Sequence, residues 1–166
     1  DSGISAHNTN NAVAHATGKY VQILNHDDFF YHENALRDIV PLLEESESKW
    51  LAAACLHTDN FETYLDRLHT PHWPGEGPMA NGVNRIGCPS VVVFERSLGL
   101  ECSKDIVYAM DCDLWIQAFR AAGEPLILPE VAVVIRMWDN QFTNNMNTAK
   151  QLELDKAAMR KKYGHS

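Results

Sequence analysis

Helix-like and strand-like segments alternate along this 166-residue chain, and this alternation constrains its fold more than any other feature. Short runs rich in β-branched and other apolar residues predict strands over residues 20–24, 50–56, 90–94, 126–128 and 131–135. Apolar residues at helical spacing predict helices over residues 5–16, 32–45, 111–122 and 146–163. Chains of this kind form a sheet with helices packed on its faces. The sequence therefore predicts the α/β class.

Two stretches are less regular. Residues 50–56 contain three consecutive alanines and would equally suit a helix, although we assign a strand. Residues 57–88 contain seven Pro and Gly residues and show no clear period, so we expect one long irregular segment. Irregular segments of this length in compact domains are usually functional or disordered.

Acidic residues outnumber basic ones, with 22 Asp and Glu against 14 Lys and Arg, and the net charge is −8. Residues 1–145 hold 9 basic and 20 acidic residues, a charge of −11, whereas residues 146–166 hold 5 basic and 2 acidic, a charge of +3. An acidic body repels a phosphate backbone, so we expect no nucleic-acid partner. We interpret residues 146–166 as a basic helix packed on the 1–145 body, with peripheral contact to a membrane surface as the alternative role.

The four cysteines include no Cys-x-x-Cys pair, which argues against a zinc ribbon, and reduced thiols are expected. No apolar run approaches the ~20 residues that a membrane-spanning helix needs.

Polar residues follow the predicted strand 20–24 directly, in the order Asn25, His26, Asp27 and Asp28. Folds of the α/β class bind ligands at the carboxyl ends of their strands. An acidic protein that holds a diphosphate needs a divalent cation between the two negative charges, and Mg²⁺ or Mn²⁺ suits oxygen ligands such as Asp27. The alternative is that Asp27 and Asp28 only cap the helix that begins near residue 32.

Asp111 and Asp113 begin the predicted helix 111–122. Acidic groups at a helix N-terminus are favourable through the helix dipole alone, so capping is one interpretation. Their place after a long irregular segment and a strand also suits a general base beside a loop that closes over an acceptor. Spacing alone leaves both interpretations open.

Five segments form a specific series when they are taken in order. They read Gly-Ile-Ser to Gly-Lys-Tyr-Val over 3–21, Leu-Asn-His-Asp-Asp at 24–28, Pro-Ser-Val-Val-Val-Phe-Glu-Arg-Ser-Leu at 89–98, Met-Asp-Cys-Asp-Leu-Trp at 110–115 and Ile-Arg-Met-Trp-Asp-Asn-Gln-Phe-Thr at 135–143. In this order they resemble the middle of a family 2 glycosyltransferase.

The resemblance implies a GT-A fold, which is a Rossmann-like mixed sheet with helices on both faces. It implies inverting transfer of a sugar from a nucleotide-diphosphate donor to the hydroxyl of a glycan or lipid-linked acceptor. By position, Asp27 would bind Mn²⁺ or Mg²⁺, and Asn25 and Asp28 would lie beside the donor. From the same resemblance we expect a role in cell-surface polysaccharide or lipopolysaccharide synthesis and a cytoplasmic location, with the inner face of the membrane as the more specific alternative.

Asp111 would be the general base on the same resemblance, and Asp113 and Trp115 would lie on the acceptor side. Trp73 and the glycine-rich stretch after it could form an acceptor-side lid with an aromatic platform for a sugar. A plain surface loop is the alternative for that stretch.

Three residues depart from the family pattern: Asn25 replaces an acid, Met110 replaces the acid before the base, and Trp138 stands where histidine is usual. These departures motivate a second hypothesis, a catalytically silent module that binds carbohydrate or assists assembly. The family's N-terminal, nucleotide-binding portion has no counterpart in these residues. We therefore expect a truncated domain that binds its donor weakly alone.

Overall fold

Six strands form one mixed sheet in the computed structural model, which describes residues 5–139, 141 and 148–164. The strands are β1 (Tyr20–Gln22), β2 (Phe29–Phe30), β3 (Trp50–Thr58), β4 (Tyr64–His69), β5 (Val92–Glu95) and β6 (Leu126–Arg136). Their order is β1-β5-β3-β6-β2, with β4 paired to β3 off this path. The β3–β6 pair is parallel and the other pairs are antiparallel. The α/β class with a mixed sheet is thus confirmed.

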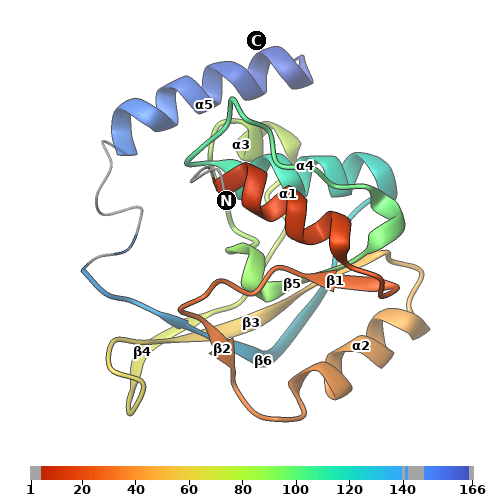
Figure 1. The fold of residues 1–166 in the computed structure, drawn as a ribbon, viewed down its shortest axis with the longest axis vertical. Coiled ribbons are helices and arrows are strands. Elements are labelled where there is room, and N and C mark those ends of the chain that lie inside the picture. Colours follow the sequence, from red (N-terminus) through yellow and green to blue (C-terminus); the bar gives the residue numbers. More distant parts are fainter. Residues whose placement is uncertain (1–4, 140, 142–147, 165–166) are drawn as a thin grey trace.

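Helices lie on both sides of this sheet, as expected (Figure 1). They are α1 (Ser5–His15), α2 (Ala35–Glu45), α3 (Glu76–Ala80), α4 (Met110–Ala122) and α5 (Thr148–Tyr163), with 3-10 turns η1 (Pro89–Val91) and η2 (Arg96–Leu98). In Figure 1, α1, α3 and α4 lie above the sheet and α2 lies below it. Some residues of the predicted segments 3–21, 135–143 and 146–163 lie outside the described part of the chain, namely 3, 4, 140, 142, 143, 146 and 147.

The central strand is β3, and its sequence explains its position. Its first six residues, 50–55, have no exposed surface. A strand that is buried on both faces reads as a continuous apolar run, so the strand assignment for residues 50–56 is confirmed and extends to Thr58. β6 pairs along one edge of β3, while β5 and β4 share the other edge, β5 at residues 50–52 and β4 at residues 55–58.

An aromatic cluster packs α4 onto the sheet. Trp50 of β3 stacks on Trp115 of α4 with ring centroids 5.9 Å apart. Trp73 stacks on Phe119 at 4.7 Å and meets the edge of Trp50 at 6.2 Å. The indole nitrogens of Trp50 and Trp115 donate to the carbonyls of Gly123 (2.9 Å) and Gly87 (3.1 Å). The cluster therefore buries large rings without leaving either indole N–H unpaired.

The expectation of one irregular segment over residues 57–88 was wrong in part, because β4 and α3 both lie within it. β4 forms through its pairing with β3. No periodicity in the sequence of β4 itself predicts this strand. The two predicted strands around Pro129 are one strand, β6, whose register against β3 shifts between Ala53 and Cys55. Proline has no N–H for the ladder, and such a shift accommodates it. β2 was not predicted, since its two residues are ordered by pairing with β6.

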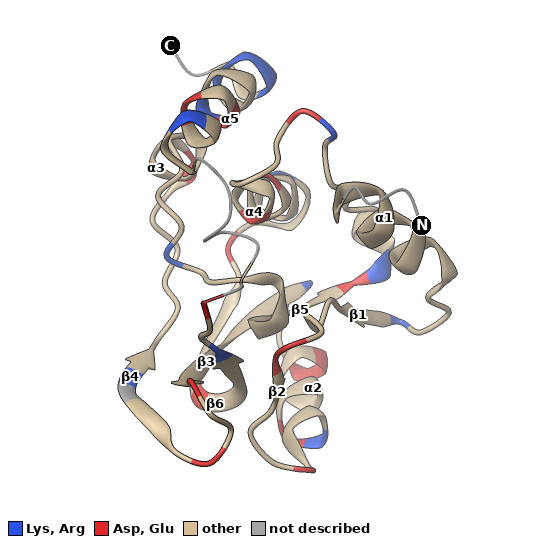
Figure 2. Ribbon diagram, turned by 60° about the vertical axis from the view of Figure 1, so that its left-hand side comes forward, with Lys and Arg blue, Asp and Glu red and all other residues tan. Residues whose placement is uncertain are grey.

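α5 packs against the body and carries much of the chain's positive charge. Figure 2 shows Lys and Arg residues along this helix. Met159 and Tyr163 are buried, and the Lys162 ammonium lies 2.8 Å from the buried Asp113 carboxylate. Part of the basic charge is thus engaged inside the fold. Among the residues that the structure describes, no helix combines the length and the apolar character needed to cross a membrane.

Candidate functional site

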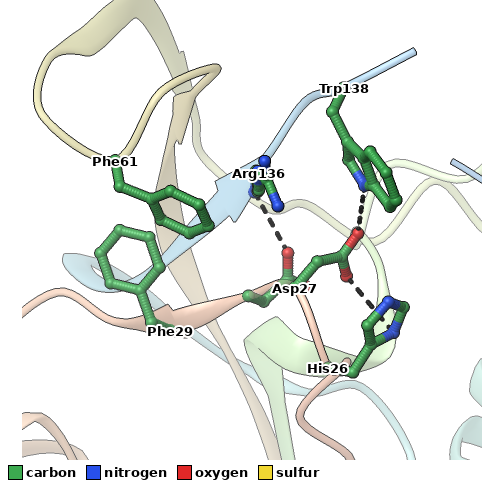
Figure 3. Close-up of a pocket in the computed structure, with 7 residues that line it drawn as sticks. His26, Asp27, Phe29, Phe61, Arg136 and Trp138 are labelled. Atoms are coloured by element: carbon green, nitrogen blue, oxygen red, sulfur yellow. Dashed lines mark hydrogen bonds and ion pairs between the residues drawn. The ribbon is translucent and has the colours of Figure 1, made fainter. Parts of the chain in front are cut away.

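An open pocket of about 500 Å³ lies where the link between β1 and β2 meets the end of β6 and the β3–β4 turn (Figure 3). It is lined by His26, Asp27, Asp28, Phe29, Phe61, Arg136 and Trp138. The acidic cluster that follows β1 therefore borders a cavity.

Asp28 is buried, at 8% exposed, and its carboxylate accepts hydrogen bonds from three parts of the chain. Its Oδ2 accepts hydrogen bonds from the Ser90 hydroxyl (2.6 Å) and the Asn25 side-chain amide (3.1 Å). Its Oδ1 accepts from the backbone N–H of Arg136 (3.2 Å). Burial raises the pKa of the Asp28 carboxyl, and these hydrogen bonds oppose that shift. The Asn25 amide is thus engaged with Asp28, and Asn25 is not among the residues that line the pocket.

Asp27 is the carboxylate that Trp138 orients. The indole Nε1 of Trp138 donates to Asp27 Oδ2 at 2.9 Å, and the His26 Nδ1 lies 3.9 Å from Asp27 Oδ1. Figure 3 shows Asp27 between these two side chains. Trp138, at the position where the resembling family has histidine, therefore contacts the predicted metal ligand itself.

Asp27 is the residue of this pocket that could hold a divalent cation. Within the described ranges, no group of three or more His, Cys, Asp or Glu side chains is placed to hold a metal ion. Mg²⁺ is commonly bound by one or two carboxylates together with substrate phosphates and water. Asp27 supplies one such carboxylate, whose Oδ2 accepts the hydrogen bond from Trp138. The donor set thus suits a cation that arrives with a phosphate-bearing ligand.

Arg136 brings positive charge and two aromatic contacts to the same pocket. Its guanidinium carbon lies 4.3 Å from the centroid of Phe61 and 5.0 Å from that of Trp138, and it sits between these rings in Figure 3. Its buried Nε has no hydrogen-bond partner within the described structure. Phe61 has a left-handed backbone (φ 67°), which turns the chain so that its ring approaches Phe29 at 5.7 Å. An arginine with an unused donor makes the pocket suitable for an anion.

Asp111 lies in the first turn of α4, and its carboxylate is hydrogen-bonded to the segment that precedes η1. The Asn84 side-chain amide donates to its Oδ2 at 2.7 Å, and the Cys112 backbone N–H donates to its Oδ1 at 2.8 Å. Burial is the main cause that raises the pKa of Asp111 to about 6. This carboxyl is half in its basic form near pH 6, which suits a general base at neutral pH.

The segment 84–90 lies between Asp111 and Asp28. Asn84 contacts Asp111, Ser90 contacts Asp28, and the charges of both carboxylates raise the pKa of the intervening Cys88, after burial, to about 12. Asp111 is not among the lining residues of the pocket, so the structure brings the two predicted acidic motifs to neighbouring positions without placing them in one cavity.

Asn84 was missed by the sequence reasoning. Its Oδ1 accepts from the backbone N–H groups of Ile86 (2.9 Å) and Gly87 (3.0 Å), so it builds a local turn as well as contacting Asp111. Asparagine in a Pro- and Gly-rich stretch is typical of such a turn. That signal predicts the turn, but not the contact with a residue 27 positions later.

The three residues expected on the acceptor side occupy interior positions. Asp113 and Trp115 have no exposed surface, and Trp73 is half-buried in the aromatic cluster. Asp113 binds Lys162, Tyr163 and Gln117. Their packing gives each a structural role, and the acceptor-side assignment of Trp73, Asp113 and Trp115 stays a prediction.

The raised pKa of Asp111 predicts a measurable link between pH and stability. A carboxyl whose pKa is higher in the folded state stabilises the fold fully below its unfolded pKa, and this contribution is lost as the pH rises through the folded pKa. Between pH 4 and 7.5, the wild-type free energy of unfolding should therefore fall relative to that of Asp111→Asn. The expected change is about 2 kcal/mol, since each pKa unit corresponds to about 1.4 kcal/mol. Urea unfolding of both proteins at the two pH values measures it, and parallel pH profiles would contradict it.

No protein-family model matches this chain, and no curated protein matches it significantly. Its fold resembles two crystal structures of S. aureus TarS, a glycosyltransferase. For TarS 1-349 the TM-score is 0.59 at 12% identity, covering 98% of this chain and 53% of TarS 1-349. For the second structure the TM-score is 0.60 at 13% identity, covering 98% and 32%. The chain thus spans about half or less of the length of these proteins. At such low identity the likeness concerns the fold alone, and this chain has a glycosyltransferase-like fold.

Proposed function

We propose that this protein is an inverting, metal-dependent GT-A glycosyltransferase of family 2. It transfers a sugar from a nucleotide-diphosphate sugar to an acceptor hydroxyl. The observation that carries the proposal is the joint presence of Asp27 and Arg136 in one pocket at the end of the sheet, in a chain with a glycosyltransferase-like fold. A diphosphate is the group that both a carboxylate-bound cation and an arginine would recognise.

Arg136 and the aromatic rings around it would receive the donor. The guanidinium between Phe61 and Trp138 would supply positive charge and N–H donors to a phosphate oxygen in the pocket. Asp27 would hold Mn²⁺ or Mg²⁺, and such a cation, when bound, stabilises the negative charge of a departing diphosphate. Trp138 keeps Asp27 oriented toward the pocket through its indole N–H.

Asp111 would be the general base. Its carboxylate takes the proton of the acceptor hydroxyl as that oxygen attacks the anomeric carbon. The bond between the anomeric carbon and the diphosphate oxygen breaks, and its electron pair leaves with the nucleoside diphosphate. One displacement inverts the configuration at the anomeric carbon. Asn84 and the Cys112 N–H fix the carboxylate, and a pKa of about 6 leaves it mostly ionised at neutral pH.

The acceptor in this proposal is a glycan or a lipid-linked glycan. The proposal places the protein in cell-surface polysaccharide or lipopolysaccharide synthesis, on the cytoplasmic side and with possible peripheral contact to the membrane. This part rests on the resemblance of the sequence motifs.

Donor binding tests the role of Asp27. We expect Asp27→Ala in the full-length protein to bind UDP in the presence of Mn²⁺ about 10- to 100-fold more weakly than wild type, since tenfold in affinity is about 1.4 kcal/mol and a metal contact contributes several. Isothermal titration calorimetry measures the affinity. Asp59→Ala removes an exposed carboxylate from the nearby β3–β4 turn and serves as the matched control. Equal affinities for Asp27→Ala and wild type would contradict the assignment.

A catalytically silent module remains the second candidate, because Trp138 already engages one oxygen of Asp27. A silent protein would bind glycan without releasing nucleoside diphosphate from a sugar nucleotide. If Asp27→Ala and Asp111→Asn both retain wild-type phenotype and turnover in the full-length protein, the enzymatic proposal fails.

A further inference from the structure

Asp155 of α5 is a buried carboxylate whose hydrogen bonds reach a distant part of the chain. It has no exposed surface. Its Oδ2 accepts from the backbone N–H groups of Tyr108 (2.6 Å) and Ala109 (2.8 Å), and Val107 N–H donates to both oxygens, at 3.1 and 3.2 Å. Gln151, one turn earlier on α5, donates to its Oδ1 at 2.8 Å. Three consecutive backbone donors therefore converge on one carboxylate.

These donors belong to the residues that lead into α4. The first N–H groups of a helix have no partner within the helix and need an acceptor from elsewhere. The residue at the N-cap of α4 is Ala109, which makes no side-chain cap hydrogen bond. Asp155, 46 positions later, therefore accepts from the N-cap residue and the two before it, and its negative charge suits the positive end of the helix dipole.

Hydrogen bonding to Asp155 adds to the packing of this entry to α4. Ile106 and Ala109 are buried in the core, at 1% and 4% exposed, whereas Val107 and Tyr108 between them are 39% and 36% exposed. Asp111 follows Ala109 by two positions and stands on the first turn of α4. The carboxylate of Asp155 thus holds the three backbone N–H groups that directly precede the first turn of α4, where Asp111 contacts Asn84.

We propose that Asp155 is a positioning residue for Asp111, so that the C-terminal helix takes part in building the catalytic centre. This inference rests on the proposed function, in which Asp111 is the general base. The backbone of residues 107–109 transmits the effect, and Asp155 itself touches no substrate. Loss of its hydrogen bonds would release the first turn of α4 and misplace the base, and displacements of about 1 Å can cost ~100-fold in rate.

A second set of buried side-chain contacts attaches α5 to α4 and does not involve the N–H groups of residues 107–109. The Tyr163 hydroxyl and the Lys162 ammonium bind the carboxylate of Asp113, whereas the N–H groups of residues 107–109 bind that of Asp155. Tyr163→Phe removes one of these bonds and keeps the ring. It is therefore a matched control, because it weakens the attachment of α5 to α4 without removing a bond to the helix entry.

The surroundings of Asp111 allow its titration to report its position. The ionisable side chains whose pKa values its charge raises are Cys88, Cys102 and Cys112. Burial raises the pKa of each thiol, to about 11 for Cys102 and higher for the others, so all three stay protonated between pH 4 and 8. The two other charges nearby, on Asp113 and Lys162, neutralise each other.

The experiment compares Asp155→Asn with Tyr163→Phe and wild type. We expect Asp155→Asn to speed hydrogen exchange at the amides of residues 107–109 about 100-fold and to lower the Asp111 midpoint from about 6 toward 4, as the carboxyl gains solvent. Carbon-13 NMR of the Asp111 carboxyl measures the midpoint. The transfer rate should fall at least about tenfold with the affinity for UDP and Mn²⁺ unchanged. Tyr163→Phe should leave the midpoint and the exchange of residues 107–109 as in wild type.

Unchanged exchange and an unchanged Asp111 midpoint in Asp155→Asn would overturn the inference. A uniform loss of active protein would lower the rate equally at every pH and leave the midpoint in place, and this outcome also counts against it. Should Asp155→Asn fail to fold, Gln151→Met keeps the charge and removes one bond to Asp155, and smaller changes in the same directions are expected. Exchange and titration need no activity, so failure of the proposed function, seen as absent turnover in wild type, is distinguishable.

Discussion

Asp111→Asn should lower the rate of sugar transfer about 1000-fold, within the ~10²–10⁴ range that a positioned general base contributes. Asparagine has nearly the same shape as aspartate but cannot take a proton from the acceptor. The affinity for the donor should stay within about twofold of wild type, because Asp111 does not line the pocket that holds Asp27 and Arg136. Release of nucleoside diphosphate at pH 7.5 with Mn²⁺ measures the rate.

Asp105→Asn is the matched control for this variant. Asp105 is exposed in the loop before α4, so its substitution removes the same charge a short distance from the helix. A wild-type rate in Asp105→Asn and a large loss in Asp111→Asn would support the assignment. The wild-type rate itself should rise with pH around a midpoint near 6, as the carboxyl ionises. A near-normal rate in Asp111→Asn would exclude it as the base.

Trp115→Ala should lower the free energy of unfolding by about 3–5 kcal/mol, the usual cost of replacing a buried aromatic residue by alanine. Trp115 has no exposed surface and stacks on Trp50. Its indole also donates to the carbonyl of Gly87, in the segment that carries Asn84. Urea unfolding followed by circular dichroism measures the change.

Trp115→Phe separates packing from hydrogen bonding at the same position. Phenylalanine keeps an aromatic ring against Trp50 but has no N–H for Gly87. The Gly87 carbonyl still receives the Asn84 amide at 2.9 Å, so the lost hydrogen bond should cost about 1 kcal/mol, and the smaller ring should add less than the full cavity does. A loss below about 1 kcal/mol in Trp115→Ala would show that the aromatic cluster is not central to stability.

Local patterns predicted most of the helices and strands, with ends within three residues of those observed. The apolar run of β3 and the period of α4 identify these elements without tertiary information. By contrast, β2 and β4 depend on pairing with β6 and β3, and their sequences lack a strong period of their own. Such pairings join residues far apart in the chain, which a local pattern does not encode.

The candidate site was predicted only in part, because some of its contacts also join residues far apart in the chain. The acidic cluster after β1 was found from its position, and Asp27 and Asp28 do line a pocket. The contacts of Phe61 and Arg136 were not found, because a turn and a strand end from distant parts of the chain meet only in the fold.

Asp111 and Asp113 show how helical geometry separates residues that look alike in sequence. Two positions along an α-helix correspond to a rotation of about 200°, so the two side chains point to different sides. Asp111 meets Asn84, whereas Asp113 faces the end of α5 and is fully buried. Pattern reasoning treated them as one pair, although the fold assigns them separate tasks.

The order in which β3 and its partner strands are synthesised has a consequence for the folding of the newly made chain. β3 is translated before all three of the strands that pair with it, and its register with β6 joins Leu51 to Leu126. Until residue 136 has left the ribosome, an apolar strand without a charged residue lacks its parallel neighbour. Exposed segments of this composition associate readily with one another. Production of the protein in cells should therefore benefit from slower synthesis at low temperature and from chaperones that shield residues 50–58.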